Sequence, residues 1–158
     1  MKFKHIFIIP VLILCCTFPA QVQEIKGKVV AISDGDTLTM LDANKKQIKI
    51  RLAEIDTPES KQPYGKRAKQ AVSKLVFAKT AIVEVQAKDR YGRIVGRVYI
   101  GDLDVNAEMV RQGAAWIYRQ YAKDQTLYNL ETKARQDKTG LWGLPEAELR
   151  PKPNRKLK

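Results

Sequence analysis

The segment 46–59 constrains the fold more than any other part of the chain. Apolar residues at positions 48, 50 and 52 alternate with polar ones, which is the period-2 pattern of a strand with one buried face. The alternation then ends, and three acids follow: Glu54, Asp56 and Glu59. A strand that runs out into an acidic segment brings carboxylates to the rim of a β-rich scaffold.

The whole pattern of short strands predicts a small barrel. The predicted strands are 25–32, 38–41, 46–53, 81–87 and 93–100. The predicted helices are 65–78, 106–112 and 125–138. One helix between the third and fourth of five strands predicts an α+β fold in which a β-barrel predominates. The expected architecture is a five-stranded Greek-key OB-fold barrel with three helices. Such barrels bind oligonucleotides across one face, but the fold alone does not indicate an enzyme.

Local signals predict where the helices begin and end. Asn106 is a favourable cap for the second helix, and Gly113 is a favourable stop. Gly140 is expected to end the third helix. Leu141 and Trp142 are then expected to pack back onto the body of the protein.

The expected strand pairing brings distant charged residues together. If the turn after the second strand is centred between positions 43 and 44, Leu41 lies opposite Lys46 and Asp36 lies opposite Arg51. Asp56 follows on the same rim. We therefore expect Asp36, Arg51 and Asp56 to converge, although a bulge would shift this register by one residue.

The first 20 residues have the features of a secretory signal peptide. Lys2 and Lys4 precede an apolar run, and Ala20 offers a small residue at the expected cleavage site. The run is too short to span a bilayer comfortably. An uncleaved leader, or a lipid anchor through Cys15 or Cys16, is the alternative. We expect a secreted or periplasmic protein with no stable membrane span once the leader is removed.

Removal of that leader would limit the chemistry available to the chain. The leader holds both cysteines and the single histidine, His5. The mature chain could then form no Ser-His-Asp triad, no cysteine nucleophile and no His/Cys zinc site. Hydrolysis would have to use carboxylates, Arg, Lys, Tyr and a hard metal ion.

The net charge favours an anionic partner. It is +12 for the full chain and falls to +10 without the leader, which holds two lysines and no acids. Nucleic acid, an anionic membrane or a wall polymer would fit, although solubility alone also accounts for such a charge. We expect the barrel domain over 21–144 and a flexible basic tail over 145–158.

Acids and arginines at the ends of the predicted strands suit phosphodiester cleavage. Asp36 and Asp56, with a backbone carbonyl, provide the hard oxygen ligands that Ca²⁺ accepts. A water on that metal ion, or beside Glu59, would be placed for attack. Arg51 and Arg93 would balance the negative charge that the phosphate gains in the transition state.

Each motif taken alone also has a plainer interpretation. The Asp-Gly pair at 34–35 is favoured in hairpin turns for backbone reasons. The segment 56–59 fits a helix cap followed by proline, and 88–93 fits a polar hairpin tip. The combination, rather than any single motif, therefore carries the hypothesis.

This combination resembles the staphylococcal (micrococcal) thermonuclease family. The matching segments are 32–37, 50–52, 55–59, 89–93, 105–113 and 140–142. The resemblance implies an OB-fold barrel with three helices, export, and Ca²⁺-dependent endo- and exonucleolytic cleavage of DNA and RNA. It also implies cleavage of the 5′ P–O bond, which leaves a 3′-phosphate.

The resemblance implies roles for individual acids. Asp36 and Asp56 match the calcium-binding carboxylates, and Thr57 matches the residue whose backbone carbonyl binds the ion. Glu59 matches the residue that orients or deprotonates the attacking water. Asp34 matches an acid that lies near the ion without binding it.

The resemblance also implies contacts to the substrate. Arg51 and Arg93 match the phosphate-binding arginines. The implied nucleotide contacts are Arg90, Tyr91 and one of Tyr118 and Tyr121, with Tyr118 the better match. Two features depart from the best-known member: the loop 60–64 is shorter than its lysine-rich loop, and Arg90 stands in place of a lysine.

Two other classes of function remain as alternatives. One is a non-catalytic barrel that binds single strands through its basic face and tyrosines. The other is a cationic protein that binds a membrane or cell wall, which leaves the paired acids unexplained. The intact acids favour a nuclease, which we expect to be a monomer acting on DNA and RNA in single-stranded or locally open regions.

Overall fold

Strands joined by short turns come first, one helix interrupts them, and two further helices follow the last long strand. A computed structural model describes residues 23–145. Its elements are β1 (Glu24–Ile32), β2 (Thr37–Leu41), β3 (Gln47–Leu52), β4 (Ile55–Asp56), α1 (Gly65–Val76), β5 (Thr80–Lys88), β6 (Ile94–Ile100), β7 (Leu103–Asp104), α2 (Val105–Arg111), β8 (Trp116–Ile117), α3 (Gln125–Gln136) and the 3-10 helix η1 (Gly140–Gly143). The predicted leader, and the predicted tail beyond Pro145, lie outside the described residues.

Five strands close into a barrel, as the sequence predicted for an OB fold. Neighbours pair antiparallel in the order β3-β2-β1-β5-β6, and β6 then pairs parallel with β3. The closing pairs are Ile50 with Ile94, Arg51 with Val95, and Leu52 with Gly96. Apolar side chains from these strands fill the interior, because every second residue points inward.

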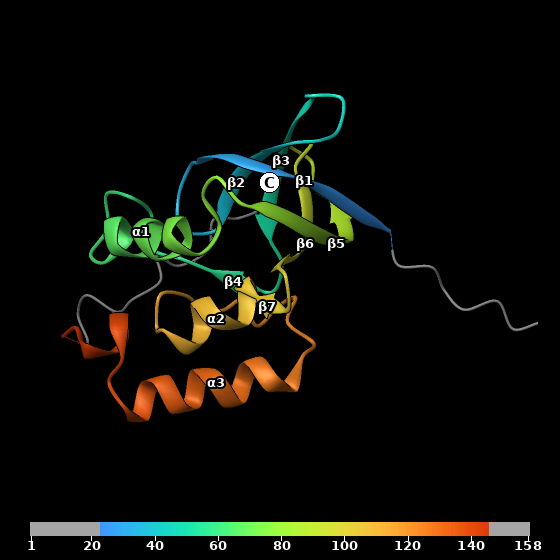
Figure 1. The fold of residues 1–158 in the computed structure, drawn as a ribbon. Helices are drawn as coiled ribbons and strands as arrows, with labels where there is room; N and C mark the ends of the chain where they lie inside the picture. The colour runs from blue at the N-terminus through green and yellow to red at the C-terminus, as the bar shows by residue number, and fades with distance from the viewer. Residues whose placement is uncertain (1–22, 146–158) are drawn as a thin grey trace, which may run out of the picture.

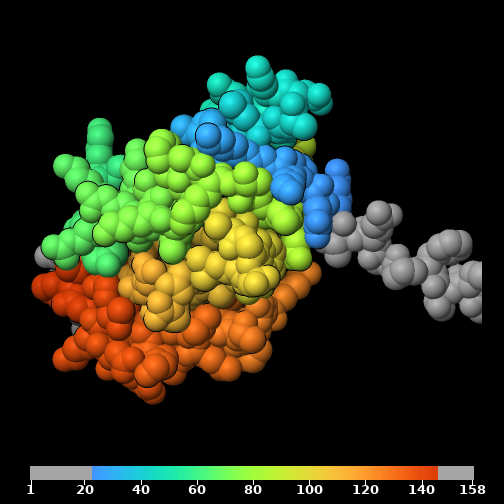
Figure 2. Space-filling view, in the orientation of Figure 1, coloured from blue at the N-terminus to red at the C-terminus, as the bar shows by residue number. Residues whose placement is uncertain are grey.

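The helices lie against one end and one side of this barrel. In Figure 1, α2 lies between the barrel and α3, and α1 lies beside both α2 and the strands. The space-filling view shows α3 as the outer layer, with the β2–β3 turn projecting from the opposite end (Figure 2). Among residues 23–145, no helix is long and apolar enough to cross a membrane.

The observed register of β2 against β3 differs from the prediction by one residue. Arg51 lies opposite Thr37 rather than Asp36, so the whole predicted pairing is shifted. The cause is a wider turn. Asp42 donates its N–H to the carbonyl of Lys46 at 3.1 Å, and its carboxylate accepts the Lys46 N–H at 2.9 Å. A side chain that bonds across a turn holds an extra residue in it.

The predicted cap of α2 is wrong. The cap is Asp104, whose carboxylate accepts the N–H of Ala107 at 2.9 Å. Asn106 is instead fully buried. Its amide donates to the carbonyl of Ala53 at 2.9 Å and accepts the N–H of Val98 at 3.0 Å. Asn106 therefore links α2 to the strands that lead into the acidic segment.

The helix α3 ends earlier than predicted, with Asp137 rather than Gly140 at its end. Gly113 does follow the end of α2 as predicted, with a φ of +61°. A Cβ on Gly113 would lie 2.1 Å from the carbonyl oxygen of Thr139. The Leu141 N–H donates to the Gly113 carbonyl at 2.8 Å, so the chain packs back as expected.

Candidate active site

The loop between β1 and β2 holds Asp36 inside the protein. At Gly35 a Cβ would lie 2.7 Å from the Thr57 hydroxyl and 2.9 Å from the Ala68 Cβ, so the loop can approach only without a side chain there. The Thr57 hydroxyl donates to Asp36 Oδ2 at 3.2 Å, and the Thr37 hydroxyl donates to Asp36 Oδ1 at 3.0 Å. The carboxylate is therefore fixed from two sides.

Arg51 bridges Asp36 and Asp56. Its Nη2 lies 3.2 Å from Asp36 Oδ2 and 3.0 Å from Asp56 Oδ1. Its other terminal nitrogen donates to the carbonyl of Leu52. The predicted convergence of the three residues is therefore observed despite the shifted register. Asp36 precedes the first paired residue of β2, and the long Arg51 side chain spans the remaining distance.

The two acids differ in their access to solvent. Asp36 comes from a buried loop, whereas the Asp56 side chain is 40% exposed. Asp56 lies in β4, which pairs with β8 through Asp56 and Trp116. A ligand could therefore approach from the Asp56 side.

Asp34 lies next to this pair. Its carboxylate accepts the N–H of Asp36 at 3.2 Å. Burial, followed by the nearby negative charge of Asp36, raises the pKa of Asp34 above its ordinary value. The Asp34 carboxyl is therefore a third acidic group at the rim that holds Asp36 and Asp56, and a nearby positive charge would stabilise its ionised form.

Asp36, Asp56 and Thr57 are the residues that could hold a hard cation such as Ca²⁺ at this rim. Both carboxylates approach one nitrogen of Arg51, so their oxygens face a common space. Within the described part of the chain, no group of three or more His, Cys, Asp and Glu side chains could hold a metal ion. A cation here would need a backbone carbonyl and water besides the two carboxylates, which is a ligand set that Ca²⁺ accepts.

Glu59 lies in the exposed segment just after Thr57. Its backbone exchanges two hydrogen bonds with Gln62, both 2.7 Å long. A Cβ on Gly65 would lie only 1.9 Å from the Glu59 carbonyl oxygen, so the first residue of α1 packs directly on the Glu59 backbone. The short loop 60–64 therefore fixes the position of Glu59.

The surface next to Glu59 is hollowed and basic. A pocket of about 590 Å³ begins at Ser60. Its basic lining residues are Lys61, Lys66 and Arg67. This lining suits a phosphate chain that continues past the acidic rim.

Arg93 is oriented by Asp89 in the turn between β5 and β6. Asp89 accepts the Arg93 backbone N–H at 2.9 Å and the Arg93 Nε–H at 2.7 Å. Burial alone would raise the pKa of Asp89, but the hydrogen bonds and charge of Arg93 outweigh it and lower that pKa. Arg93 Nη1 then donates to the Thr37 hydroxyl at 3.3 Å, and this hydroxyl donates to Asp36. Arg51 and Arg93 thus reach Asp36 by two different routes.

Arg90 and Tyr91 lie at the exposed tip of the same turn. Tyr91 is 65% exposed. The guanidinium carbons of Arg90 and Arg93 lie 4.8 Å and 5.6 Å from the centre of its ring. Such a ring is available for stacking by a base, with positive charge beside it.

Tyr118 and Tyr121 form an aromatic pair shortly after β8. Their ring centres are 4.9 Å apart in an edge-to-face arrangement. Burial, then the neighbouring Tyr121 and the charge of Asp56, raises the pKa of Tyr118. Since Asp56 pairs with Trp116, two residues before Tyr118, this aromatic pair adjoins the acidic rim.

Sequence reasoning missed several residues that support the site. It assigned no role to Thr37 or Asp89, although Asp89 four residues before Arg93 is a turn signal that could have been used. It counted Glu54 among the carboxylates at the rim, whereas Glu54 is buried and its carboxylate accepts the N–H of Lys123. It assigned no role to Arg97. The contacts of both residues join segments that lie far apart in the sequence, so no local pattern marks these contacts.

The chain is similar to known proteins over most of its length. Residues 49–143 match the family described as staphylococcal nuclease homologue. An Escherichia coli protein named as an uncharacterized endonuclease is 45% identical over 135 residues, which cover 85% of this chain and 88% of that protein. The micrococcal nuclease of Shigella flexneri is 41% identical over 147 residues, covering 86% and 83%. An uncharacterized endonuclease of Haemophilus influenzae is 45% identical over 115 residues, covering 73% and 65%.

Proposed function

The chain belongs to the staphylococcal nuclease homologue family, which supports nuclease activity on nucleic acids, and we propose that it is an exported, Ca²⁺-dependent phosphodiesterase. It would hydrolyse both DNA and RNA with little sequence preference, as an endonuclease and exonuclease. Contacts to the backbone dominate such binding, and they carry no sequence information.

The observation that carries the proposal is the arrangement around Asp36. Two arginines reach that carboxylate, Arg51 directly at 3.2 Å and Arg93 through the Thr37 hydroxyl. A scissile phosphate next to Asp56 would meet both guanidinium groups. Planar guanidinium groups bind phosphate oxygens with two parallel hydrogen bonds where geometry allows.

Each residue would have a distinct role in hydrolysis. Glu59 would orient the attacking water or accept its proton. The water oxygen bonds to phosphorus and the bond to the 5′ oxygen breaks, so that the 5′ oxygen leaves with a proton and the other product keeps a 3′-phosphate. Arg51 and Arg93 would stabilise the charge that develops on the phosphate.

The acidic rim would hold the metal ion. Asp36 and Asp56 would bind it through their carboxylates and Thr57 through its backbone carbonyl, with Asp34 nearby. Ca²⁺ bound there would supply positive charge for the phosphate oxygens.

The aromatic and basic residues around the rim would bind the rest of the substrate. Arg90, Tyr91, Tyr118 and Tyr121 would contact the nucleotides, since base stacking on tyrosine tolerates any sequence. Stacking requires unpaired bases, so single-stranded or locally open regions would be preferred. We further propose that the protein acts as a monomer that is secreted or periplasmic.

Digestion of supercoiled plasmid tests the proposal. Wild type should nick and degrade it in Ca²⁺ and leave it intact in chelator, and end-group analysis should find 3′-phosphates. Arg93→Gln should lose about 10²–10³ in rate, by analogy with the loss of an oxyanion donor. Glu59→Gln should lose about 10²–10⁴, the usual contribution of a general base. Lys49→Gln, an exposed change on β3, is the matched control and should keep wild-type activity.

Two results would contradict the proposal. DNA and RNA left intact in Ca²⁺ would remove the enzyme claim. Tight oligonucleotide binding without cleavage would favour the alternative function, a non-catalytic barrel that binds single strands.

A further inference from the structure

Glu54 connects β3 to β4 in an unusual backbone conformation. Its φ is +63°, a region in which glycine is favoured and other residues are strained. The residue is also only 8% exposed. Such a conformation persists where surrounding contacts hold it, and it often marks a functional constraint.

Contacts from Glu54 hold both ends of the segment 118–124. Its backbone carbonyl accepts the N–H of Tyr118 at 2.8 Å. Its carboxylate accepts the N–H of Lys123 at 2.7 Å and that of Asp124 at 3.3 Å. Glu54 therefore holds the segment at Tyr118 through its backbone and just beyond Tyr121 through its side chain.

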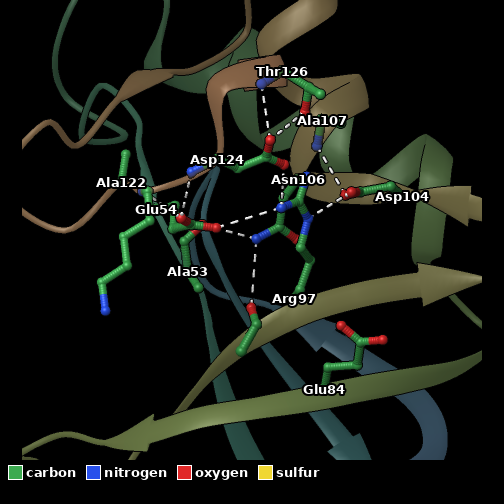
Figure 3. Close-up of polar contacts among 12 residues, drawn as sticks. Ala53, Glu54, Glu84, Arg97, Asp104, Asn106, Ala107, Ala122, Asp124 and Thr126 are labelled. Atoms are coloured by element: carbon green, nitrogen blue, oxygen red, sulfur yellow. Dashed lines mark hydrogen bonds and ion pairs between the residues drawn. The ribbon is translucent and has the colours of Figure 1, made fainter. Parts of the chain in front are cut away.

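A single arginine anchors this carboxylate from the barrel side. Arg97 Nη1 lies 3.5 Å from Glu54 and 2.6 Å from Asp124, and Arg97 Nε lies 2.6 Å from Asp104 (Figure 3). Asp104 and Asp124 also cap α2 and α3. Burial alone would lower the pKa of Arg97, but Asp124 and Asp104 raise it, so the guanidinium stays charged. The network joins β6, both helix starts and the Glu54 carboxylate.

The segment held in this way adjoins the acidic rim. Within the segment, the N–H of Tyr121 donates to the Tyr118 carbonyl at 2.9 Å, which keeps the two rings together. Asp56 follows Glu54 by two residues and pairs with Trp116. Glu54 therefore contacts the segment that carries the tyrosine pair and lies two residues before Asp56 in the chain.

We propose that Glu54 is a positioning residue that sets Tyr118 and Tyr121 against the acidic rim, and thereby determines the affinity for the nucleotide beside the scissile phosphate. This inference rests on the proposed nuclease function. Glycine would adopt this backbone conformation without strain. We therefore infer that the contribution of the glutamate side chain is its hydrogen bonds to the backbone N–H groups of 123–124. Losing them should loosen the tyrosines while leaving Arg51 and Arg93 in place.

The test compares Glu54→Gly with Ala78→Gly. Both variants relieve a positive φ, which is +63° at Glu54 and +61° at Ala78, but Ala78 is exposed and its change alters no charge. Glu54→Gly should raise KM for a short oligonucleotide about five- to tenfold, a part of what stacking on an aromatic ring contributes. The kcat should stay within about threefold, since the arginines do not move. Ala78→Gly should change neither constant, and Glu54→Gln should recover part of the KM because its amide oxygen can still accept from 123–124.

A double-mutant cycle separates positioning from a general loss of structure. In a Tyr118→Ala, Tyr121→Ala background, Glu54→Gly should raise KM less than about twofold, because the rings that it positions are gone. A full five- to tenfold effect in that background, or an unchanged KM in the single variant, would overturn the inference. Urea unfolding confirms that each variant is folded.

Oligonucleotide binding in chelator keeps the two hypotheses distinguishable. If wild type does not cleave, the proposed function fails. Fluorescence anisotropy can still show whether Glu54→Gly weakens oligonucleotide binding only when the two tyrosines are present. Equal affinity of wild type and Glu54→Gly for the oligonucleotide would count against the inference.

Discussion

Replacing Arg51 with methionine should destabilise the protein in chelator, and Ca²⁺ should restore most of the loss. Arg51 bridges two carboxylates, and its own side chain is 13% exposed. Methionine keeps the apolar stem but removes the charge. Asp36, with a side chain 9% exposed, would then be left as a buried anion beside Asp34.

The structure sets the size of the effect. Removing one partner of a buried ion pair costs about 3–5 kcal/mol. Asp36 keeps its two threonine hydroxyl bonds, which reduces that cost, and the bridge to the more exposed Asp56 adds at most about 1 kcal/mol. We expect a net loss of about 2–3 kcal/mol, which lowers Tm by roughly 6–15 °C in a domain of this size.

Thermal unfolding followed by circular dichroism measures the difference. Wild type, Arg51→Met and the exposed control Lys49→Met are compared in excess chelator and in excess Ca²⁺. A cation would neutralise the same two carboxylates, and at 100 times its Kd it stabilises a protein by about 2.7 kcal/mol. The deficit of Arg51→Met should therefore shrink in Ca²⁺, while Lys49→Met should follow wild type throughout.

Two outcomes would refute this reasoning. Equal Tm values for Arg51→Met and wild type in chelator would show that the guanidinium does not offset repulsion at the rim. Equal stabilisation of both proteins by Ca²⁺ would show that the cation and Arg51 do not act on the same carboxylates.

Three further predictions concern the scaffold. Asn106→Ala should lower the free energy of unfolding in urea by about 2–4 kcal/mol, because it leaves buried backbone groups without partners. Gly113→Ala should unfold at lower temperature, since its Cβ would meet the Thr139 carbonyl. Hydrogen bonds, first from Thr126, lower the pKa of Asp124, so its carboxylate stabilises the fold above the ordinary value of 3.8 and loses that effect as pH falls through the lower folded value. Asp124→Asn should therefore reduce stability at pH 7, and urea unfolding should show that deficit shrinking below about pH 4.

Local sequence patterns were enough to predict the barrel strands, because strand formation and turns depend mainly on residues that are neighbours in the sequence. Alternation and turn residues marked all five barrel strands within one or two residues of their observed ends. The short strands β4, β7 and β8 have two residues each, too few to show any periodicity. The register of β2 and β3 failed because the Asp42 carboxylate widens the turn, which depends on a side-chain contact rather than on spacing.

The candidate site could be predicted where a long side chain compensates for a one-residue error in the strand register. The Arg51 guanidinium reaches Asp36 even though the backbone pairing is one residue away from the expected one. The roles of residues that act through tertiary contacts could not be predicted in this way. Glu54 bonds to the N–H of Lys123, 69 residues later, and Arg97 reads in the sequence only as the polar member of an alternating strand.

The parallel seam between β3 and β6 has a consequence for how this protein becomes active. Ile50 lies opposite Ile94 there, so Arg51 and Arg93 flank the same junction from its two sides. Joining these strands requires residues more than forty positions apart to meet, so we expect the junction to form after the local hairpins. The phosphate-binding site would therefore form only when β3 pairs with β6 and closes the barrel. Recovery of nuclease activity during refolding should lag behind the formation of the individual hairpins. Molecules in which β3 and β6 are not yet paired should have no activity, rather than weak activity.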